Sequence, residues 1–342
     1  MNALPTAAVI AVAIVAIVAM LGASEVLVRG VGRLARNLAL LGGLVGLIVA
    51  LCADSPEISS SVAAVANGSA ATAAGVVFGS NIFNIAILLG GAALARGELR
   101  MHRAVIAVDA GVAIAVTVAV GGSTAGVIPV VVGWVLVLVV FVPYVLFLVL
   151  RPRTVARLPL PAPVHTLLAA ASREAAMEGD ELEAELEGFG GIIAPPRSWR
   201  PVLLMAPSLA IIVLGATFAV QSALVLGGRW RIPTVLIGVT ALAGATSLPN
   251  AYAAIRLAIG GHGAAVVSAT FNSNTLNLIA GIAAPLLFVP SLGAAVPPGY
   301  IVWLLGMSVL AVVLVVRRLT RFGAAILLVA YAAFVVYAVA SA

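Results

Sequence analysis

The chain has 342 residues, of which 63% are hydrophobic and 9% are charged, and its formal net charge is +6. Soluble domains are about half apolar and about a quarter charged, so this composition excludes an ordinary soluble protein. The apolar runs are long and continuous, which favours spanning helices over a β-barrel. The basic residues are all arginines that lie between these runs, not in the single patch typical of nucleic-acid binding.

Dividing the chain at charges, prolines and glycine clusters predicts ten membrane-spanning helices. They cover residues 5–28, 39–65, 71–95, 103–121, 125–150, 201–226, 232–258, 263–289, 299–316 and 322–341. Residues 1–150 then form one five-helix unit, residues 201–342 form a second, and 151–200 form the loop between them. All arginines except Arg229 and Arg231 fall on one side of the membrane. By the positive-inside rule this side is cytoplasmic, so we expect the loop in the cytoplasm and both termini outside the cell membrane.

The two halves repeat each other in sequence at one constant offset. The aligned segments are Leu21–Ser24 with Leu214–Thr217, Pro56 with Pro249, Asn81 with Asn274, and Asn84 with Asn277. Because each half has an odd number of predicted spans, the second copy enters the membrane from the opposite side. The sequence therefore predicts an all-α polytopic membrane protein with ten helices in a 5+5 inverted-topology repeat, which is typical of secondary transporters.

The loop over 151–200 holds seven of the twelve acidic residues, from Glu174 to Glu187. The stretch Thr166–Leu186 is predicted to form an amphipathic helix. The acidic residues lack the spacing of an EF-hand, so we interpret the loop as a solvated linker and not as a cation sensor.

Acidic residues inside spans are costly in a bilayer and are usually functional. Asp54 and Glu57 are three residues apart, which places both carboxylates on one helix face. Pro56 lies between them and removes a backbone N–H, which frees carbonyl oxygens to join the carboxylates. A hard divalent cation such as Ca²⁺ prefers this mixture of oxygen ligands.

Two further acidic residues fall within predicted spans. Glu25 has Arg29 one turn away, so an ion pair and a transport role both stay open. Asp109 lies two turns beyond Arg103, and we interpret it as structural.

Neutral polar groups follow the acidic pair in the next predicted helix, where Ser80 and Asn84 lie one turn apart. Such a stripe is also typical of contacts between helices. However, Ser80 follows Glu57 at the spacing at which Ser273 follows Asn250. Two copies at one spacing, each behind a helix broken by proline, are expected to converge near the bilayer midplane and form an ion site.

Enzyme chemistry is not predicted. The sequence has no H-E-x-x-H, P-loop, G-x-S-x-G or Cys/His cluster. An intramembrane hydrolase that uses the acidic pair lacks a nucleophile and an oxyanion site. We expect no cofactor, and the sequence does not fix the oligomeric state.

Four stretches resemble the two α-repeats of the cation/Ca²⁺ exchanger superfamily, in particular its sodium/calcium exchanger branch. They are Ala53–Glu57 with Gly79–Asn84, and Ala245–Asn250 with Asn272–Asn277. The usual forms in that family are G-T-S-x-P-E and G-S-N-I-x-[ND]. The resemblance implies that Ca²⁺ is exported in exchange for Na⁺ by alternating access. It also implies that the ions bind among the second, third, seventh and eighth spans, while the first and sixth spans slide across them.

The resemblance implies inorganic cations as substrates and Glu57 as the Ca²⁺ carboxylate of the first repeat. With Asp54 added from its place beside Glu57, the candidate metal ligands are Asp54, Glu57, Ser80, Asn84, Thr246, Ser247, Asn250, Ser273 and Asn277.

The sequence departs from the family pattern at three of these motif positions. Asn250 stands where the second repeat usually has glutamate, Asp54 replaces a serine, and Ala53 replaces a threonine. Both carboxylates therefore lie in the first repeat, where they still balance one Ca²⁺. Without a cation they repel each other, which favours protonation of one of them. An antiporter of Ca²⁺ or another cation coupled to H⁺, or a relative that does not transport, stays an alternative.

Overall fold

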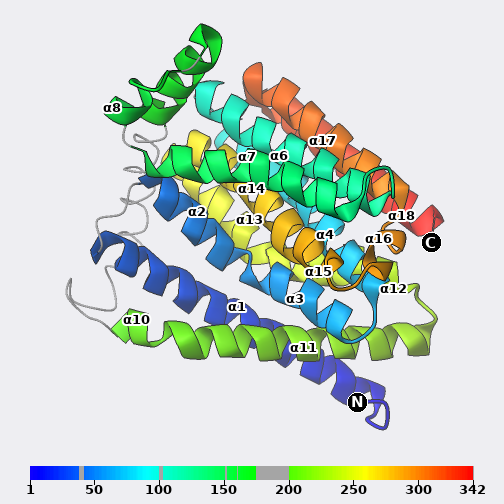
Figure 1. Cartoon of the computed structure of the whole chain (residues 1–342). Helices are drawn as coiled ribbons and strands as arrows, with labels where there is room; N and C mark the ends of the chain where they lie inside the picture. Colours follow the sequence, from blue (N-terminus) through cyan, green and yellow to red (C-terminus); the bar gives the residue numbers. More distant parts are fainter. Residues whose placement is uncertain (38–41, 100–102, 151, 160, 175–199, 342) are drawn as a thin grey trace.

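The computed structural model describes residues 1–37, 42–99, 103–150, 152–159, 161–174 and 200–341, and this part of the chain is almost wholly helical (Figure 1). The elements of the first half are α1 (Thr6–Asn37), α2 (Gly42–Ala53), α3 (Ser55–Ala66), α4 (Ala70–Phe83), the π-helical η1 (Asn84–Gly91), α5 (Ala92–Arg96), β1 (Glu98–Leu99), α6 (Arg103–Thr124) and α7 (Val130–Val149). The segment after α7 contains α8 (Pro152–Val155) and a helix over residues 162–174.

The second half of the chain differs from the first in the order of its short elements. It contains α10 (Arg200–Leu203), α11 (Met205–Trp230), α12 (Thr234–Leu236), the π-helical η2 (Ile237–Leu242), α13 (Ala243–Gly260), α14 (Gly263–Leu278), the π-helical η3 (Ile279–Ala283), α15 (Ala284–Leu286), α16 (Ser291–Ala294), α17 (Pro298–Val316), β2 (Leu319–Thr320) and α18 (Arg321–Ala340).

Eight helices of the described part are long and apolar enough to cross a membrane. They are Thr6–Gly30, Ala70–Arg96, Arg103–Thr124, Val130–Val149, Met205–Trp230, Thr234–Gly260, Pro298–Val316 and Arg321–Ala340. The segments Leu47–Ala53 and Ser55–Ala66, bent by 52°, form a ninth candidate. The predicted span 263–289 corresponds to α14, η3 and α15, and the asparagines and hydroxyl residues of α14 make this segment less apolar than the others. The prediction of an all-α membrane protein is confirmed.

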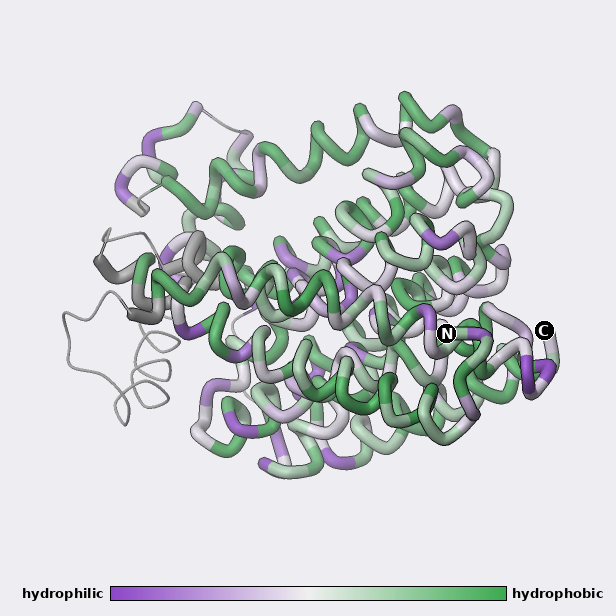
Figure 2. Tube along the Cα trace, turned by 90° about the horizontal axis from the view of Figure 1, so that it is seen from below, coloured by the Kyte–Doolittle hydropathy of each residue, from purple (hydrophilic) through white to green (hydrophobic). Residues whose placement is uncertain are grey.

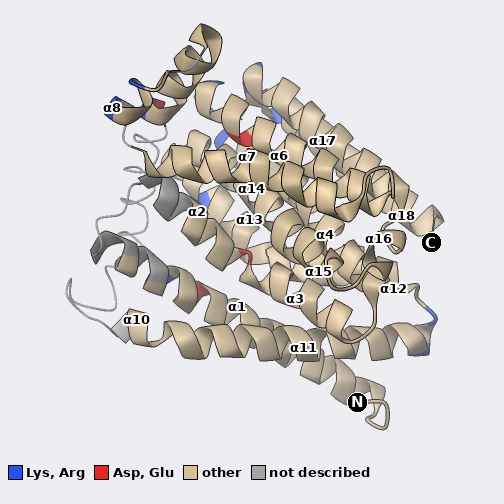
Figure 3. Cartoon of the chain, in the orientation of Figure 1, with Lys and Arg blue, Asp and Glu red and all other residues tan. Residues whose placement is uncertain are grey.

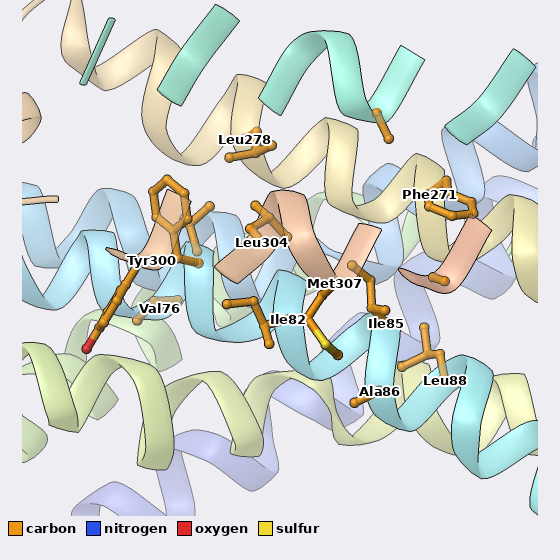
Figure 4. Packing of buried hydrophobic residues seen from close by; sticks show 14 of the residues in the cluster. Val76, Ile82, Ile85, Ala86, Leu88, Phe271, Leu278, Tyr300, Leu304 and Met307 are labelled. Atoms are coloured by element: carbon orange, nitrogen blue, oxygen red, sulfur yellow. The ribbon is translucent and has the colours of Figure 1, made fainter. Parts of the chain in front are cut away.

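The helix formed by α4, η1 and α5 lies at the centre of the bundle. In its most apolar stretch 89% of the residues are buried, against 22% for α1 and for α7. Figure 4 shows Ile82 of α4 next to Leu304 and Met307 of α17 within the buried apolar cluster. The hydropathy colouring is mostly hydrophobic along the helices (Figure 2). The outer helices expose large aliphatic side chains such as Val15 and Val329, which suits a lipid environment.

α1 and α11 pack against each other along one side of the bundle (Figure 1). Close packing here depends on Gly215 of α11, because a side chain at this position would lie 2.9 Å from the carbonyl oxygen of Ala16. Small residues allow helix backbones to approach closely in membranes, where packing provides most of the helix association.

The basic residues lie towards the ends of the helices, whereas acidic residues also lie within the bundle (Figure 3). At one end, β1 pairs with β2 and Glu98 forms an ion pair with Arg318 at 3.7 Å. Arg229, at the end of α11, donates hydrogen bonds to the backbone oxygens of Asn2 and Leu4 near the N-terminus.

The segment after α7 contacts the membrane bundle directly. A Glu174 carboxylate oxygen accepts hydrogen bonds from the backbone N–H groups of Ala104 (3.0 Å) and Val105 (2.9 Å), at the start of α6. A carboxylate at a helix N-terminus satisfies backbone donors that have no partner within the helix. The amphipathic helix predicted over Thr166–Leu186 begins earlier, at residue 162, and its part beyond residue 174 lies outside the described residues.

α4 also approaches η2 closely. A Cβ atom on Gly238 would overlap the carbonyl oxygen of Thr72 and lie 2.9 Å from the backbone nitrogen of Val76. We expect Gly238→Ala to destabilise the protein by about 1–3 kcal/mol, the typical cost of overpacking, because the atoms that it meets belong to the backbone. Gly244→Ala is the matched control, since nothing lies within 4 Å of a Cβ at that position. Thermal unfolding in detergent should show a lower Tm for Gly238→Ala alone, and equal Tm values would contradict the packing.

Candidate functional site

The chain bends at Asp54, between α2 and α3, because Pro56 at the start of α3 lacks a backbone N–H. This loss frees the carbonyl oxygen of Cys52, one turn earlier. Ser55 Oγ donates to that oxygen at 2.6 Å and Ser24 Oγ of α1 donates at 3.3 Å. The freed carbonyl was expected to join the carboxylates, but two serine hydroxyls bind it instead.

The second half does not contain a matching break. Pro249 lies inside the continuous helix α13, so the expectation that the polar residues of both repeats follow a proline-broken helix is wrong for this repeat. A proline removes one hydrogen bond and bends a helix without necessarily ending it. The irregular part of this span is η2, which lies before the proline.

The carboxylates of Asp54 and Glu57 face side chains of the second half. Both residues are buried, with 1% and 0% of their surface exposed. Asn250 Nδ2 donates to Asp54 Oδ1 at 2.8 Å and to Glu57 Oε1 at 3.4 Å. Ser247 Oγ donates to Glu57 Oε1 at 2.9 Å, and Ser273 Oγ donates to Asp54 Oδ1 at 2.5 Å. Hydroxyl and amide donors from α13 and α14 thus hold both carboxylates.

α4 and η1 meet α14 at the same place. Asn84 Nδ2 donates to Ser273 Oγ at 3.2 Å and to Asn274 Oδ1 at 3.4 Å. Asn81 Nδ2 donates to the backbone oxygen of Asn274 at 3.0 Å, and Asn274 Nδ2 donates to the backbone oxygen of Asn81 at 3.1 Å. These reciprocal bonds fasten α4 to α14 beside the carboxylates. The sequence analysis used Asn81 and Asn274 only to align the repeats and missed this role.

All nine candidate ligands are buried. Direct hydrogen bonds join six of them, namely Asp54, Glu57, Asn84, Ser247, Asn250 and Ser273. The hydroxyl of Thr246 instead donates to the backbone oxygens of Leu242 and Ala243. Ser80 Oγ and both side-chain polar atoms of Asn277 have no hydrogen-bond partner among the described residues.

Several oxygens of the site also lack a hydrogen-bond donor among the described residues. They are Asp54 Oδ2, Glu57 Oε2, Ser80 Oγ, Asn84 Oδ1 and Asn277 Oδ1. A buried polar atom without a partner is costly, and a buried carboxylate oxygen is the costliest of these atoms. A bound cation satisfies carboxylate oxygens of this kind, and the donor set has the carboxylate, hydroxyl and amide character of a hard-cation site.

Among the described residues, no arginine forms an ion pair with Asp54 or Glu57. Glu25 pairs with Arg29 at 2.9 Å on the exposed side of α1, which favours the ion-pair interpretation of that residue. No group of three or more His, Cys, Asp and Glu side chains that could hold a metal occurs among the described residues. The negative charge of the site therefore comes from two carboxylates, and its other oxygens are neutral.

Asp109 lies outside this site. It is buried and accepts hydrogen bonds from Tyr144 and Ser268. An ion pair with Arg103 is absent from the described residues. The sequence analysis missed these contacts because Tyr144 and Ser268 are distant in sequence and belong to other helices.

A known family accounts for this arrangement. A family model described as "Sodium/calcium exchanger protein" matches residues 8–151 and 200–340. The chain belongs to this family. Members of the sodium/calcium exchanger family are cation exchangers and antiporters of membranes and not enzymes, as the sequence analysis predicts.

Individual relatives match nearly the whole chain. A protein of Alkalimonas amylolytica named "Putative antiporter CaxA" is 26% identical over 338 residues, covering 93% of this chain and 94% of the relative. Two structures of the sodium-calcium exchanger NCX_Mj, soaked with 2.5 mM Na⁺ and either 10 mM or 0.1 mM Sr²⁺, match with TM-scores of 0.61 and 0.60. They are 20% and 19% identical and cover 99% of this chain and 100% of NCX_Mj. The exchanger family and this chain thus share a fold over their full lengths.

α3, which carries Glu57, is fastened to η3 by a hydrogen bond from Ser61 Oγ to the backbone oxygen of Gly281 at 2.8 Å. We expect Ser61→Ala to lower the stability by about 0.5–1.5 kcal/mol, the usual net value of such a bond. The neighbouring Ser60 is equally buried, but its hydroxyl has no partner among the described residues, so Ser60→Ala should be neutral or slightly stabilising. Urea or thermal unfolding of the two variants in detergent checks this difference. A larger loss for Ser60→Ala would contradict the hydrogen-bond assignment.

Proposed function

We propose that this protein exports Ca²⁺ from the cell in exchange for Na⁺ by alternating access. The observation that carries the proposal is the buried site at which Asp54 and Glu57 of the first half meet Ser247, Asn250 and Ser273 of the second half. Its two carboxylates and its hydroxyl and amide oxygens form a ligand set suited to Ca²⁺ or Na⁺. The nine candidate ligands remain those named from the sequence.

Charge balance favours a divalent substrate. Two carboxylates in an apolar interior without an arginine partner have a large desolvation cost, which one Ca²⁺ offsets. The position usually occupied by glutamate in the second repeat is Asn250, whose amide nitrogen lies next to both carboxylates. Asp54 then supplies the second negative charge from the first repeat. The site therefore has the same two negative charges as the family pattern, which has one glutamate in each repeat.

We propose ten spans in a 5+5 inverted repeat, with residues 1–150 and 201–342 as the two units and 151–200 as the loop. The proposed span that is missing from the nine candidates, the eighth in chain order, consists of α14, η3 and α15. The reciprocal bonds between Asn81 and Asn274 support the inverted repeat, because residues at equivalent positions of the two halves form the same contact in both directions.

We propose that the loop lies in the cytoplasm and that both termini lie outside. The contacts at the two ends of the bundle support this orientation. Arg229 contacts the N-terminal residues at one end, whereas Glu98 contacts Arg318 at an end rich in arginine. The positive-inside rule makes the arginine-rich end cytoplasmic.

The pair formed by α1 and α11 is proposed to slide across the site. These helices pack against each other at one side of the bundle (Figure 1). Ser24 of α1 reaches Cys52 O at the bend beside Asp54, so this pair directly adjoins the ion site. A sliding pair that opens the site to either side in turn provides alternating access.

Coupling to H⁺ is the second candidate, and one observation favours it. A single amide nitrogen, Asn250 Nδ2, lies within hydrogen-bond distance of both Asp54 and Glu57. Two negative charges so close together repel each other when no cation lies between them, which favours binding of a proton by one of them. The antiporter would then exchange Ca²⁺ or another cation for H⁺.

We expect Glu57→Gln and Asp54→Asn each to weaken Ca²⁺ binding at least about tenfold, equal to about 1.4 kcal/mol, because each removes one of the two negative charges of the site. Isothermal titration of the purified protein in detergent measures this binding. Glu25→Gln is the matched control, since Glu25 is exposed and paired with Arg29. Unchanged affinity in both site variants would refute the assignment of these carboxylates.

We expect radioactive Ca²⁺ to enter proteoliposomes loaded with Na⁺ when the outside solution is free of Na⁺, and we expect Glu57→Gln to abolish this uptake. Proteoliposomes prepared without Na⁺ on either side, with an interior more acidic than the outside solution, test coupling to H⁺. Uptake driven only by the pH gradient would reject Na⁺ coupling and support the second candidate. Absence of uptake under both gradients, with wild-type protein that still binds Ca²⁺, would favour a relative that does not transport.

A further inference from the structure

A second buried polar cluster lies outside the ion site, where α6, α7 and α14 meet. It contains Asp109 of α6, Tyr144 of α7, and Ser268 and Asn272 of α14. Asp109, Tyr144 and Asn272 are each less than 10% exposed. The cluster has one carboxylate, and the proposed exchange mechanism does not use it.

Three pairs of oxygen atoms in this cluster lie at hydrogen-bond distance. Tyr144 Oη is 2.9 Å from Asp109 Oδ1 and 2.6 Å from Asn272 Oδ1, and Ser268 Oγ contacts Asp109 Oδ2. Each contact needs one hydrogen between its oxygens. The hydroxyls of Tyr144 and Ser268 each provide a single hydrogen, so two hydrogens serve three contacts when the carboxylate is ionised. A proton on Asp109 supplies the third.

The orientation of the Asn272 amide supports this count. Its Nδ2 faces Ser268 Oγ at 3.5 Å, so Oδ1 faces Tyr144 as an acceptor. The opposite orientation would give Tyr144 an amide N–H donor. However, the contact between Tyr144 and Asn272 is 2.6 Å long, which is shorter than an N–H···O hydrogen bond and typical of an O–H···O hydrogen bond. The hydrogen of Tyr144 therefore serves Asn272, and a proton on Asp109 serves the contact between Asp109 and Tyr144.

The oxygens of this cluster have the spacing of direct hydrogen bonds, with lengths of 2.9 Å and 2.6 Å for the two contacts of Tyr144.

Within the described residues, the helices around Asp109 offer little charge to hold it ionised. Tyr144 is the titratable side chain of α7, and α14, α16 and η3 contain none. On α17, Tyr300 packs against the aromatic rings of Phe334 and Tyr337. Arg103 and Glu174 lie at the N-terminal end of α6, where Glu174 binds backbone N–H groups.

We propose that Asp109, with Tyr144, Ser268 and Asn272, forms a proton-binding site in which the carboxyl group carries one proton. α14 connects this site to the ion site, because Asn272 directly precedes Ser273, whose hydroxyl donates to Asp54. Loss of the proton removes the hydrogen between one pair of oxygens and leaves them to repel each other. Release therefore acts on the helix that carries two of the candidate ion ligands.

Infrared spectroscopy of the full-length protein tests this site directly. The carbonyl stretch of a carboxylic acid is separate from the bands of a carboxylate, and a detergent without ester groups keeps that region clear. The spectrum of the wild type minus that of Asp109→Asn should contain one carboxylic-acid band at neutral pH, which gives way to carboxylate bands at alkaline pH. A difference spectrum with only carboxylate bands at neutral pH would overturn the proposal.

Two further variants keep the test decisive. Tyr144→Phe and Ser268→Ala each remove one hydrogen-bond partner of the carboxyl group, so each should shift the carboxylic-acid band of the wild type even where Asp109→Asn does not fold. Glu25→Gln, at an exposed ion pair, should leave the band in place. A carboxylic-acid region unaffected by both Tyr144→Phe and Ser268→Ala would overturn the proposal. These outcomes do not depend on which cations the protein exchanges.

Discussion

The site depends on the burial of two like charges without a basic partner. Asp54 and Glu57 are almost fully enclosed, and neutral donors from α13 and α14 bind only one oxygen of each carboxylate. A buried carboxylate has a desolvation cost of several kcal/mol, and neutral hydrogen bonds recover only part of it. The remaining cost makes cation binding favourable. Close packing around α4 keeps these donors in position, through the asparagine bonds to α14 and the glycine contact with η2.

Much of the fold follows from composition and spacing. Apolar runs of about 20 residues bounded by arginine predict nearly all of the long helices. A segment in lipid forms a helix because its backbone N–H and C=O groups must bind each other. α14 is the exception in hydropathy. Its asparagines and all of its hydroxyl residues except Ser268 are buried among other helices, which the sequence alone does not reveal.

The candidate site was predictable to the extent that it repeats. The common spacing of Glu57 to Ser80 and of Asn250 to Ser273 indicated four polar positions. The structure buries all four, and Asn250 and Ser273 lie at hydrogen-bond distance from the first-repeat carboxylates. The partner of each group was not predictable, because these contacts cross between the halves. Examples are the hydrogen bond from Ser247 to Glu57 and the pair of hydroxyls on Cys52 O. The sequence also predicted that Pro56 frees a backbone carbonyl oxygen. It did not predict that Ser24 of α1 and Ser55 bind this oxygen, which belongs to Cys52.

The contact of Glu174 with the start of α6 has a mechanical consequence. Its carboxylate binds two free N–H groups in the first turn of the helix, those of Ala104 and Val105, while Ala171 of the same segment packs against these residues. α6 therefore cannot shift along its axis relative to the segment without exposing two backbone donors and opening an apolar contact. The helix over residues 162–174 therefore restrains that end of α6 against movement along its axis.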